Sequence, residues 1–324
     1  MSSPRRGRLR RTARRGAAVV LAVLVVVTLA SFAYNRATGT PATAPAGLTY
    51  VRTGDVLTRV AVHGTTGPAV VLVPGFAETA DTWDGVGRRL ADGHRAIAYD
   101  VVGMGYTERR GPYDLDHATR QLLALLDAQH VDRAVLVGHS SGAAVVVEAA
   151  LRAPDRVAGV VLLDGDALAT GAGARSPVRF VVRPPWRTTV LRLAVRSDSV
   201  VRSVYGGQCG PRCPRLDAAG VDAWRRPFQV AGAEDALWSM LDEGVLGVSP
   251  QRVAQVAALD VPKAVVFGAQ DDVFPPGTPQ ETARRIGAPA PVLIPDARHL
   301  TPVSDPDAVA RAVSAVAAAA RPGD

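Results

Sequence analysis

The segment from Val135 to Gly142 reads Val-Leu-Val-Gly-His-Ser-Ser-Gly and constrains the fold more than any other part of the chain. An apolar run typical of a buried strand leads directly into Gly-x-Ser-x-Gly, with Ser140 at its centre. A serine on a sharp turn between a strand and a helix needs small residues two positions away on both sides. Gly138 and Gly142 meet this need, and the context predicts a nucleophile elbow rather than a chance pentapeptide.

Residues 143–151 are almost entirely apolar and predict a helix that begins directly after the elbow. The N–H groups at the start of such a helix point toward Ser140. Negative charge that develops at this position is therefore stabilised by the end of the helix.

A serine hydroxyl is a weak nucleophile until a base takes its proton and an acid orients that base. Two later strands offer both groups. The apolar run 264–267 ends at a loop that contains Asp271, and the run 291–294 continues to His299. The remaining histidines lie in helix-to-strand connections, in a polar stretch or beside the elbow. We therefore predict His299 as the base and Asp271 as the acid.

The order serine, acid, histidine resembles that of the α/β-hydrolase superfamily. The chain is most similar to its cap-bearing branch of serine esterases, C–C bond hydrolases and cofactor-free haloperoxidase-like enzymes, over about Leu48 to Ala319. The resemblance implies an α/β-hydrolase fold, with a mainly parallel central sheet, helices on both faces and an inserted, largely helical cap.

The family's acid strand typically ends in Gly-x-x-Asp with a proline four residues later, and Gly268, Asp271 and Pro275 fit this register. The resemblance therefore favours Asp271 over the neighbouring Asp272. Some relatives place the acid after an earlier strand. Asp164, which follows the apolar run 160–163 together with Asp166, is the alternative acid.

The resemblance also implies an oxyanion hole. Pro74-Gly75-Phe76-Ala77 follows the predicted strand 69–73, with proline where many relatives carry histidine. By this alignment the donors are the backbone N–H groups of Phe76 and Ser141. The Phe76 ring can be a core aromatic at the same time. His63-Gly64 looks similar but lies in a Gly/Thr/Pro-rich turn, for which we predict a β-hairpin.

Periodicity agrees with a single α/β core that carries a lid. Short apolar strands alternate with helical patterns such as 119–129 and 307–319, which predicts a mainly parallel sheet covered on both faces. The opening strands, about 49–62, alternate more strongly and are predicted to be antiparallel.

The region from about 165 to 260 is rich in proline and arginine and is longer than an ordinary crossover. We interpret it as a cap with a helix over 188–204. Its tryptophans, Trp186, Trp224 and Trp238, line a substrate pocket or, more simply, pack the cap onto the core. One interpretation of its arginines is that they attract anionic substrates or lipid headgroups. The other, which we favour, is that they form a solvated face. They are Arg175, Arg179, Arg183, Arg187, Arg192, Arg196, Arg202, Arg225 and Arg226.

The formal net charge of +7 belongs to the N-terminus, because residues 1–16 hold seven arginines and no acids, which leaves 7 − 7 = 0 for the rest. No recognised binding fold or basic-aromatic stripe accompanies this charge, so nucleic-acid binding is not predicted.

The basic segment is followed by seventeen uncharged residues, Ala17 to Ala33. This run is near the short end of the membrane-spanning range, and Tyr34 can extend it to the interface. Alternatively, it is a signal sequence cleaved near Ala33, where Ser31-Phe32-Ala33 provides small residues. We favour an uncleaved, single-pass anchor. Both readings place the hydrolase domain outside the cytoplasm, because the arginines stay inside.

The predicted organisation is thus a basic cytoplasmic segment (1–16), an anchor or signal sequence (17–34), a linker (35–47) and a hydrolase domain (48–320) with its cap. The two cysteines, Cys209 and Cys213, lie four residues apart. In an exported protein they predict a disulfide that stiffens the cap and that catalysis does not need. They lack further ligands for a metal site, and no cofactor is implied.

Together these features predict a serine hydrolase that forms an acyl-enzyme on a carboxylic ester or similar acyl substrate, small or lipid-like. Cleavage of a C–C or amide-like bond by the same triad is an alternative. So is a non-catalytic binding protein on the hydrolase scaffold. Epoxide hydrolases and haloalkane dehalogenases share the fold but carry aspartate at the elbow, so Ser140 argues against both.

Overall fold

The computed structural model describes residues 4–169 and 183–320, with side chains from Arg14 onward. These residues belong to two compact units. One comprises residues 1–41 and 175–198, and the other comprises residues 42–174 and 199–324. The larger unit contains the sheet and all the predicted site residues, and the two units are described separately below.

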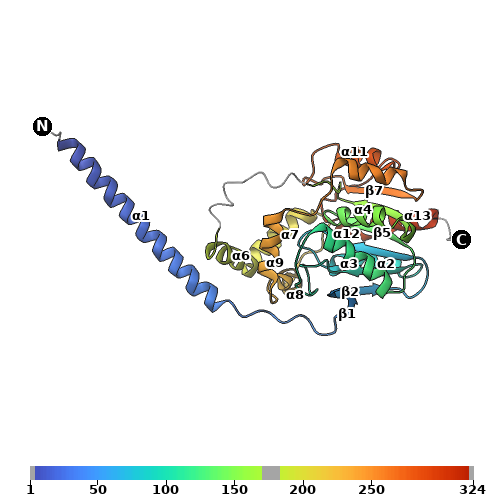
Figure 1. The fold of residues 1–324 in the computed structure, drawn as a ribbon, viewed down its shortest axis with the longest axis horizontal. Helices are drawn as coiled ribbons and strands as arrows, with labels where there is room; N and C mark the ends of the chain where they lie inside the picture. The colour runs from blue at the N-terminus through green and yellow to red at the C-terminus, as the bar shows by residue number, and fades with distance from the viewer. Residues whose placement is uncertain (1–3, 170–182, 321–324) are drawn as a thin grey trace. The chain divides into compact units, whose positions relative to one another are not determined.

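The larger unit is built on one eight-stranded sheet (Figure 1) in the order β1-β2-β4-β3-β5-β6-β7-β8. The β1–β2 and β2–β4 pairs are antiparallel, and all other neighbours are parallel. The strands are β1 (Thr49–Thr53), β2 (Val56–His63), β3 (Ala69–Val73), β4 (Arg95–Tyr99), β5 (Ala134–His139), β6 (Val157–Leu163), β7 (Lys263–Gly268) and β8 (Val292–Ile294).

Helices cover both faces of this sheet (Figure 1). One layer contains α3 (Leu115–Ala128), α4 (Gly142–Arg152) and α11 (Thr278–Ile286), and the other contains α2 (Asp84–Leu90) and α13 (Pro306–Ala319). Short elements complete the turns between them: η1 (Ala80–Trp83), η2 (Pro154–Arg156) and α12 (Thr301–Ser304).

The two layers enclose two cores, because successive side chains of a strand point to opposite faces of the sheet. In β3, Val71 and Val73 pack with the α3 and α4 layer, whereas Val70 and Leu72 pack with the α2 and α13 layer. The central strands are buried on both faces, which explains why they read as continuous apolar runs in the sequence. The predicted parallel sheet with helices on both faces is confirmed.

The connection between β2 and β3 differs from the prediction. β1 and β2 are antiparallel as predicted, but the hairpin predicted after His63 is wrong, because β4 lies between β2 and β3. After His63 the chain leaves β2 and enters β3, which is not adjacent to β2 in the sheet. The His63 ring packs against Gly87 of α2, where a Cβ would lie only 2.3 Å from His63 Cδ2. Its position is set by a helix rather than by a tight turn.

Between β6 and β7 the chain forms helices. In the larger unit these are α7 (Asp198–Cys209, which starts at the last residue of the smaller unit), α8 (Ala218–Arg225), η3 (Arg226–Phe228), α9 (Ala233–Glu243), α10 (Pro250–Ala254) and η4 (Gln255–Ala258). The single helix predicted over 188–204 is wrong. α6 (Trp186–Arg196) ends before Ser197, whose backbone is extended, and a new helix begins at Asp198.

Trp224 and two arginines of the predicted cap have structural contacts, in agreement with the interpretation that such residues pack and solvate the cap. Trp224 stacks against Tyr205, with ring centroids 5.2 Å apart, and therefore packs α8 against α7. Arg225, the last residue of α8, and Arg226, the first residue of η3, both form ion pairs with Asp222 of α8. Of the other predicted cap arginines, Arg175 and Arg179 lie outside the described residues.

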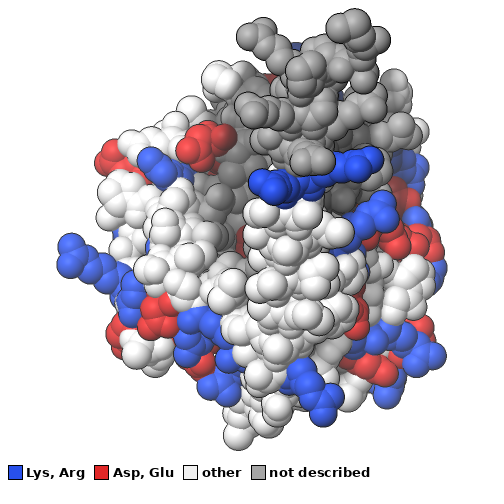
Figure 2. Space-filling model, turned by 90° about the vertical axis from the view of Figure 1, so that its left-hand side faces the viewer, with Lys and Arg blue, Asp and Glu red and all other residues white. Residues whose placement is uncertain are grey.

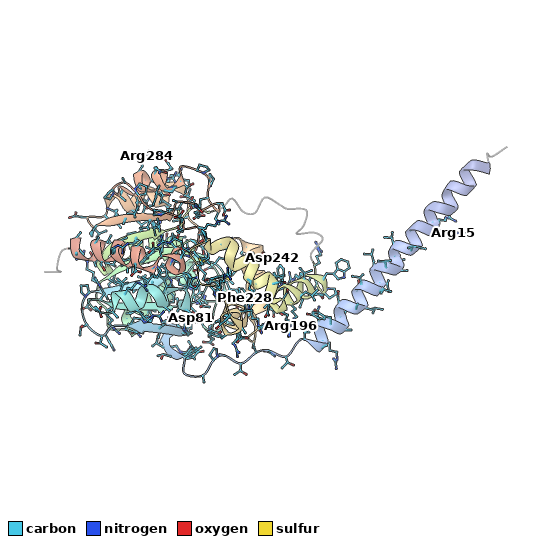
Figure 3. The ribbon with its side chains drawn as sticks, turned by 180° about the vertical axis from the view of Figure 1, so that it is seen from behind. Arg15, Asp81, Arg196, Phe228, Asp242 and Arg284 are labelled. Atoms are coloured by element: carbon cyan, nitrogen blue, oxygen red, sulfur yellow. A yellow bond between two sulfur atoms is a disulfide. The ribbon has the colours of Figure 1, made fainter. Side chains whose placement is uncertain are left out.

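The smaller unit consists of α1 (Pro4–Ala37) and α6. Residues Arg14–Ala37 of α1 include an 18-residue window with a mean hydropathy of 2.6 and are long and apolar enough to cross a membrane, although a signal sequence has the same properties. Most of their large apolar side chains are exposed, and Figure 2 shows a broad uncharged surface on this helix. Arg15 lies toward the N-terminal end of α1, whereas Arg196 of α6 lies near the C-terminal end of α1 (Figure 3).

The last turn of α1 is hydrogen-bonded to α6. Asn35 Nδ2 donates to the carbonyl of Pro185 (2.9 Å), Thr189 Oγ1 donates to Asn35 Oδ1 (3.0 Å), and Arg192 donates to the Asn35 carbonyl (2.6 Å). One asparagine thus uses its amide and its backbone to hold the end of the apolar helix against α6. The helix continues through Ala37, beyond the predicted end of the apolar segment at Tyr34.

Glu148 joins α4, the helix after the elbow, to α10. Its carboxylate accepts hydrogen bonds from Arg252 (2.9 Å) and Arg152 (2.7 Å). The hydrogen bond from Arg252 is the main reason that the pKa of Glu148 is lowered, with Arg152 adding to it against the opposing effect of burial. A lowered pKa means that this stabilisation is present above the pKa of the unfolded chain and is lost at more acidic pH.

We expect Glu148→Gln to reduce the free energy of unfolding by about 1 to 3 kcal/mol at pH 7, because two charge-assisted bonds are lost. The difference from wild type should disappear as the pH falls through the folded-state pKa of Glu148, since the wild-type carboxylate is then protonated. Urea unfolding of the full-length protein in detergent, at neutral pH and at pH about 3, measures both values. Equal differences at the two pH values would contradict the assignment.

Candidate active site

Ser140 occupies the turn between β5 and α4, as the elbow pattern predicts. Its φ is 50°, in the left-handed region, and its N–H donates to the carbonyl of Leu163 at 2.9 Å. A Cβ on Gly138 would lie 2.5 Å from the carbonyl oxygen of Gly142, and one on Gly142 would lie 2.6 Å from that of Val73. The two glycines are therefore required by close backbone approach, and the strained turn projects the serine above the sheet.

The predicted base and acid lie beside this serine. His299 Nε2 is 3.0 Å from Ser140 Oγ, and His299 Nδ1 is 2.9 Å from Asp271 Oδ2. Asp271 follows β7 and His299 follows β8, so the loops after three strands of the sheet meet at one edge. The second oxygen of Asp271 accepts the N–H of Val273 (2.9 Å), which fixes the carboxylate. The structure brings the three predicted residues into one hydrogen-bonded chain.

The competing acids are placed elsewhere. Asp272 is exposed. Asp164 is fully buried, but its Oδ1 accepts the N–H of Gly268 (2.7 Å) and its Oδ2 accepts the hydroxyl of Thr301. Asp166 accepts the N–H of Leu168 (2.9 Å). Among these four carboxylates, all within the described residues, Asp271 is the one hydrogen-bonded to Nδ1 of His299, so the geometry favours it over its neighbours.

The segments that carry the two predicted oxyanion donors meet at the serine, since a Cβ on Gly75, the residue before Phe76, would lie 2.9 Å from Ser140 Cβ. Phe76 belongs to the loop after β3, and Ser141 follows Ser140 directly. Within the described residues, neither backbone N–H donates a hydrogen bond to another protein group. The next amide, that of Ala77, points to Met104 Sδ (3.1 Å). Two unsatisfied amides close to a serine are suited to binding a negatively charged oxygen.

Several other groups near these residues could not be predicted from the sequence. Phe274 lies three residues after Asp271, and its ring centroid is 5.8 Å from that of His299. Glu78 and His139 lie directly beneath the site. His139 Nδ1 is 2.8 Å from Glu78 Oε1, and Asp164 Oδ2 is 3.6 Å from His139 Nε2. Glu78, His139 and Asp164 therefore form a buried cluster beneath Ser140 and His299.

The predicted disulfide is present between Cys209 and Cys213. Its loop touches the segment that carries His299. The N–H of Leu300 donates to the carbonyl of Gln208 (3.1 Å), and buried Cys209 packs against the Leu300 side chain. Arg298 also donates to the carbonyl of Gly207 (3.1 Å). The bridge thus stiffens the cap at the point where the cap meets the histidine loop.

Replacing both cysteines by serine is expected to lower the free energy of unfolding by about 2 kcal/mol, the chain-entropy estimate for so short a loop. His299 keeps its bonds to Asp271 and Ser140, so turnover at 20 °C should change by less than about threefold. Thermal unfolding and initial rates on the same samples test both statements. A much larger loss of turnover would show that the histidine loop depends on the bridge.

A pocket opens beside the oxyanion loop. It is lined by Ala77, Gly103, Met104, Gly105, Arg109, Pro227, Phe228, Ala233, Leu237 and Met240. Ala77 follows Phe76, whereas Phe228 and the helix α9 come from the insertion between β6 and β7 (Figure 3). The guanidinium of Arg109 donates to the carbonyls of Met104 (3.0 Å) and Gly105 (2.6 Å), so its charge is held in the wall. The remaining lining is largely apolar.

Among the residues that the structure describes, no group of three or more His, Cys, Asp or Glu side chains has the arrangement of a metal site.

Comparison with known proteins agrees with this architecture. The family model described as "Alpha/beta hydrolase family" matches residues 70–312. Epoxide hydrolase A of Mycobacterium tuberculosis is 42% identical over 123 residues, 36% of this chain and 38% of that protein. Lipase LipV of the same organism is 36% identical over 124 residues, 38% of this chain and 47% of that protein. The matches thus span less than half the length of these curated relatives.

Solved structures extend the likeness across the sheet and its insertion. A thermophilic esterase from Thermogutta terrifontis has 25% sequence identity and a TM-score of 0.66, and the match covers 83% of this chain and 97% of that one. Fold and elbow together define an enzyme of the α/β-hydrolase type. The chain belongs to the α/β-hydrolase family.

Proposed function

We propose that this protein is a serine hydrolase that cleaves a carboxylic ester through a triad of Ser140, His299 and Asp271 and an acyl-enzyme intermediate. The observation that carries the proposal is the hydrogen-bonded chain from Ser140 Oγ to His299 (3.0 Å) and on to Asp271 (2.9 Å). A nucleophile, a base and an orienting acid in this geometry are suited to acyl transfer.

In the first step, Ser140 Oγ attacks the carbonyl carbon of the ester while its proton passes to His299 Nε2. Asp271 accepts the hydrogen bond from Nδ1–H, which holds the ring in the required tautomer and stabilises the imidazolium. The oxyanion of the tetrahedral intermediate is bound by the N–H groups of Phe76 and Ser141. The intermediate collapses when the C–O bond to the alcohol breaks, and the alcohol leaves with the proton from His299.

In the second step, water replaces the alcohol. His299 takes a proton from the water, whose oxygen attacks the acyl carbon, and the same two amides bind the new oxyanion. When the bond to Ser140 Oγ breaks, His299 returns the proton to the serine. The free acid leaves, and the enzyme is restored without any net change.

The pocket beside the oxyanion loop supports an apolar acyl group. Its wall consists mainly of aliphatic, aromatic and methionine side chains, and the charge of Arg109 is engaged by backbone carbonyls. The esterase and lipase names of two similar proteins fit this choice of substrate. The epoxide hydrolase name of a third fits less well, because the resemblance implies aspartate at the elbow of those enzymes where this chain has Ser140.

We further propose that α1 anchors the enzyme in the cell membrane, with residues 1–16 in the cytoplasm and the hydrolase domain, 48–320, outside. The cap would then comprise about 165–260. The apolar length of Arg14–Ala37 and the arginine-rich N-terminus support this arrangement.

The test of the catalytic proposal is covalent labelling of the full-length protein in detergent with a fluorophosphonate probe. We expect one labelled serine in the wild type and none in Ser140→Ala. The same preparations are then given p-nitrophenyl esters of increasing acyl length, and Ser140→Ala is expected to lose all but a small residual fraction of the wild-type rate.

Absence of labelling in a folded wild-type sample would contradict the proposal. Labelling without turnover of any ester would instead direct attention to C–C or amide-like substrates of the same triad. Fractionation tests the location separately, since an anchored enzyme stays with the membranes after alkaline carbonate extraction and a cleaved one is released.

A further inference from the structure

His139 is the last residue of β5 and immediately precedes Ser140, yet the proposed mechanism does not use it. Its side chain is fully buried. Each ring nitrogen faces a different loop of the active site. This arrangement is unusual for a residue whose neighbours in the strand are aliphatic, and it joins the elbow to both of the loops that assist the serine.

On one side the ring meets the oxyanion loop. Nδ1 of His139 lies 2.8 Å from Oε1 of Glu78, which is itself buried. The second carboxylate oxygen, Oε2, accepts the N–H of Gly75 at 3.1 Å. Gly75 directly precedes Phe76, the residue proposed to supply an oxyanion donor. Glu78 therefore connects the imidazole to the backbone that aims this donor.

On the other side the ring meets the histidine loop. Nε2–H of His139 donates to the backbone carbonyl of His299 at 2.7 Å. The two rings have centroids 5.0 Å apart. The bond restrains the main chain of His299, while Asp271 and Ser140 restrain its side chain. The backbone position of the proposed base is thus set from beneath by the residue next to the nucleophile.

Nε2 of His139 is hydrogen-bonded to a carbonyl and Nδ1 lies at ion-pair distance from a carboxylate, and both contacts favour the imidazolium form, which has a hydrogen on each nitrogen. Burial alone would lower the pKa of His139, but the carboxylates of Glu78 and Asp164 outweigh it and hold the pKa well above the ordinary value. Asp164, 3.6 Å from Nε2, also accepts the hydroxyl of Thr301 in the same loop as His299.

We propose that His139 is a positioning residue that holds the oxyanion loop and the backbone of His299 in register with Ser140. The proposal rests on the proposed function of this site. Its physical basis is that displacements near 1 Å in a catalytic group cost on the order of 100-fold in rate. A single buried ring next to the nucleophile limits the movement of both assisting loops relative to the serine.

Stability alone accounts poorly for this cluster. Taking three ionisable groups out of water carries a large desolvation cost, and apolar residues of similar volume often stabilise a fold as well as a buried ion pair. Orientation accounts for it better, because His139 bonds to loops that carry the proposed base and oxyanion donor rather than to distant parts of the core.

The test uses two variants that each keep one arm of the ring. The amide of Gln reaches the position of Nε2, so His139→Gln keeps a donor for the His299 carbonyl. The amide of Asn replaces Nδ1, so His139→Asn keeps a donor for Glu78. The matched control is His117→Gln on α3, because His117 is also buried and lies 3.2 Å from a carboxylate, that of Asp55, away from this site.

All variants are prepared as the full chain in detergent, their reactive sites are counted with fluorophosphonate, and kcat and KM are measured on one ester. We expect kcat per reactive site to fall by about 10- to 100-fold in both His139 variants, with KM changed by less than about threefold. His117→Gln should lower the melting temperature without changing kcat per site.

Glu78→Gln keeps the shape and the acceptor for Gly75 but removes the charge, and it serves if a His139 variant does not fold. We expect a loss of kcat of about tenfold per reactive site. Unchanged kcat per site in the folded His139 variants, or in Glu78→Gln, would overturn the positioning role and leave a structural one. Failure of the wild type to react with fluorophosphonate would instead overturn the proposed function, and the positioning role with it.

Discussion

Replacing Ser140 by alanine is expected to lower kcat by about 10⁶-fold, the loss found when the nucleophile of a serine hydrolase is removed. The methyl group cannot attack a carbonyl carbon, and no acyl-enzyme forms. The amides of Phe76 and Ser141 remain, so a residual rate above that in water, by roughly 10³-fold, should persist from oxyanion binding alone. Steady-state hydrolysis of the best p-nitrophenyl ester measures the loss.

The neighbouring Ser141 provides the matched control. Ser141→Ala removes a hydroxyl from the same turn but keeps the backbone N–H, so kcat should stay within about threefold of wild type. The two melting temperatures should agree closely, since both changes remove one oxygen from the same segment. If Ser140→Ala retained more than about 1% of the wild-type kcat, Ser140 would not be the nucleophile.

Asp271→Asn is expected to reduce kcat by about 10⁴-fold while leaving the fold intact. The asparagine amide can donate a hydrogen bond to Nδ1 of His299. That arrangement places the proton of the neutral ring on Nε2. The protonated Nε2 faces Ser140 Oγ and cannot accept the serine proton. The imidazolium formed during attack also loses its negative partner. Rates at saturating ester concentration measure the effect.

The adjacent carboxylate separates this role from a general effect of charge. Asp272 is exposed and is not part of the hydrogen-bonded chain of Ser140, His299 and Asp271, so Asp272→Asn should keep kcat within about threefold of wild type while changing the net charge by the same amount as Asp271→Asn. Comparable losses in the two variants would assign the effect of Asp271→Asn to the electrostatics of the loop instead of to the triad.

The sequence predicted the parts of the molecule that depend on short patterns. Strand periodicity and strand ends gave the parallel sheet, and the two glycines around Ser140 gave the elbow, because backbone crowding leaves a direct mark on residue type. The proximity of Asp271 and His299 to Ser140 followed from topology, since the carboxyl ends of neighbouring parallel strands meet at one edge.

The parts that the sequence did not reveal depend on pairing between distant segments. Nothing near His63 indicates that β4 inserts between β2 and β3, because strand order is decided by long-range packing. The break between α6 and α7 at Ser197 lies in a stretch whose helical pattern continues on both sides. Glu78 reads as an ordinary polar loop residue, and only the fold shows that its carboxylate meets His139.

The two internal methionines of the chain, Met104 and Met240, both line the pocket beside the oxyanion loop. A methionine side chain is unbranched and changes rotamer easily, so it adapts its shape to whatever it contacts. A wall containing two such side chains can follow acyl groups of different widths without movement of the backbone. We therefore expect tolerance of many related esters, with activity that varies gradually along a series of homologous acyl chains rather than peaking sharply at one length.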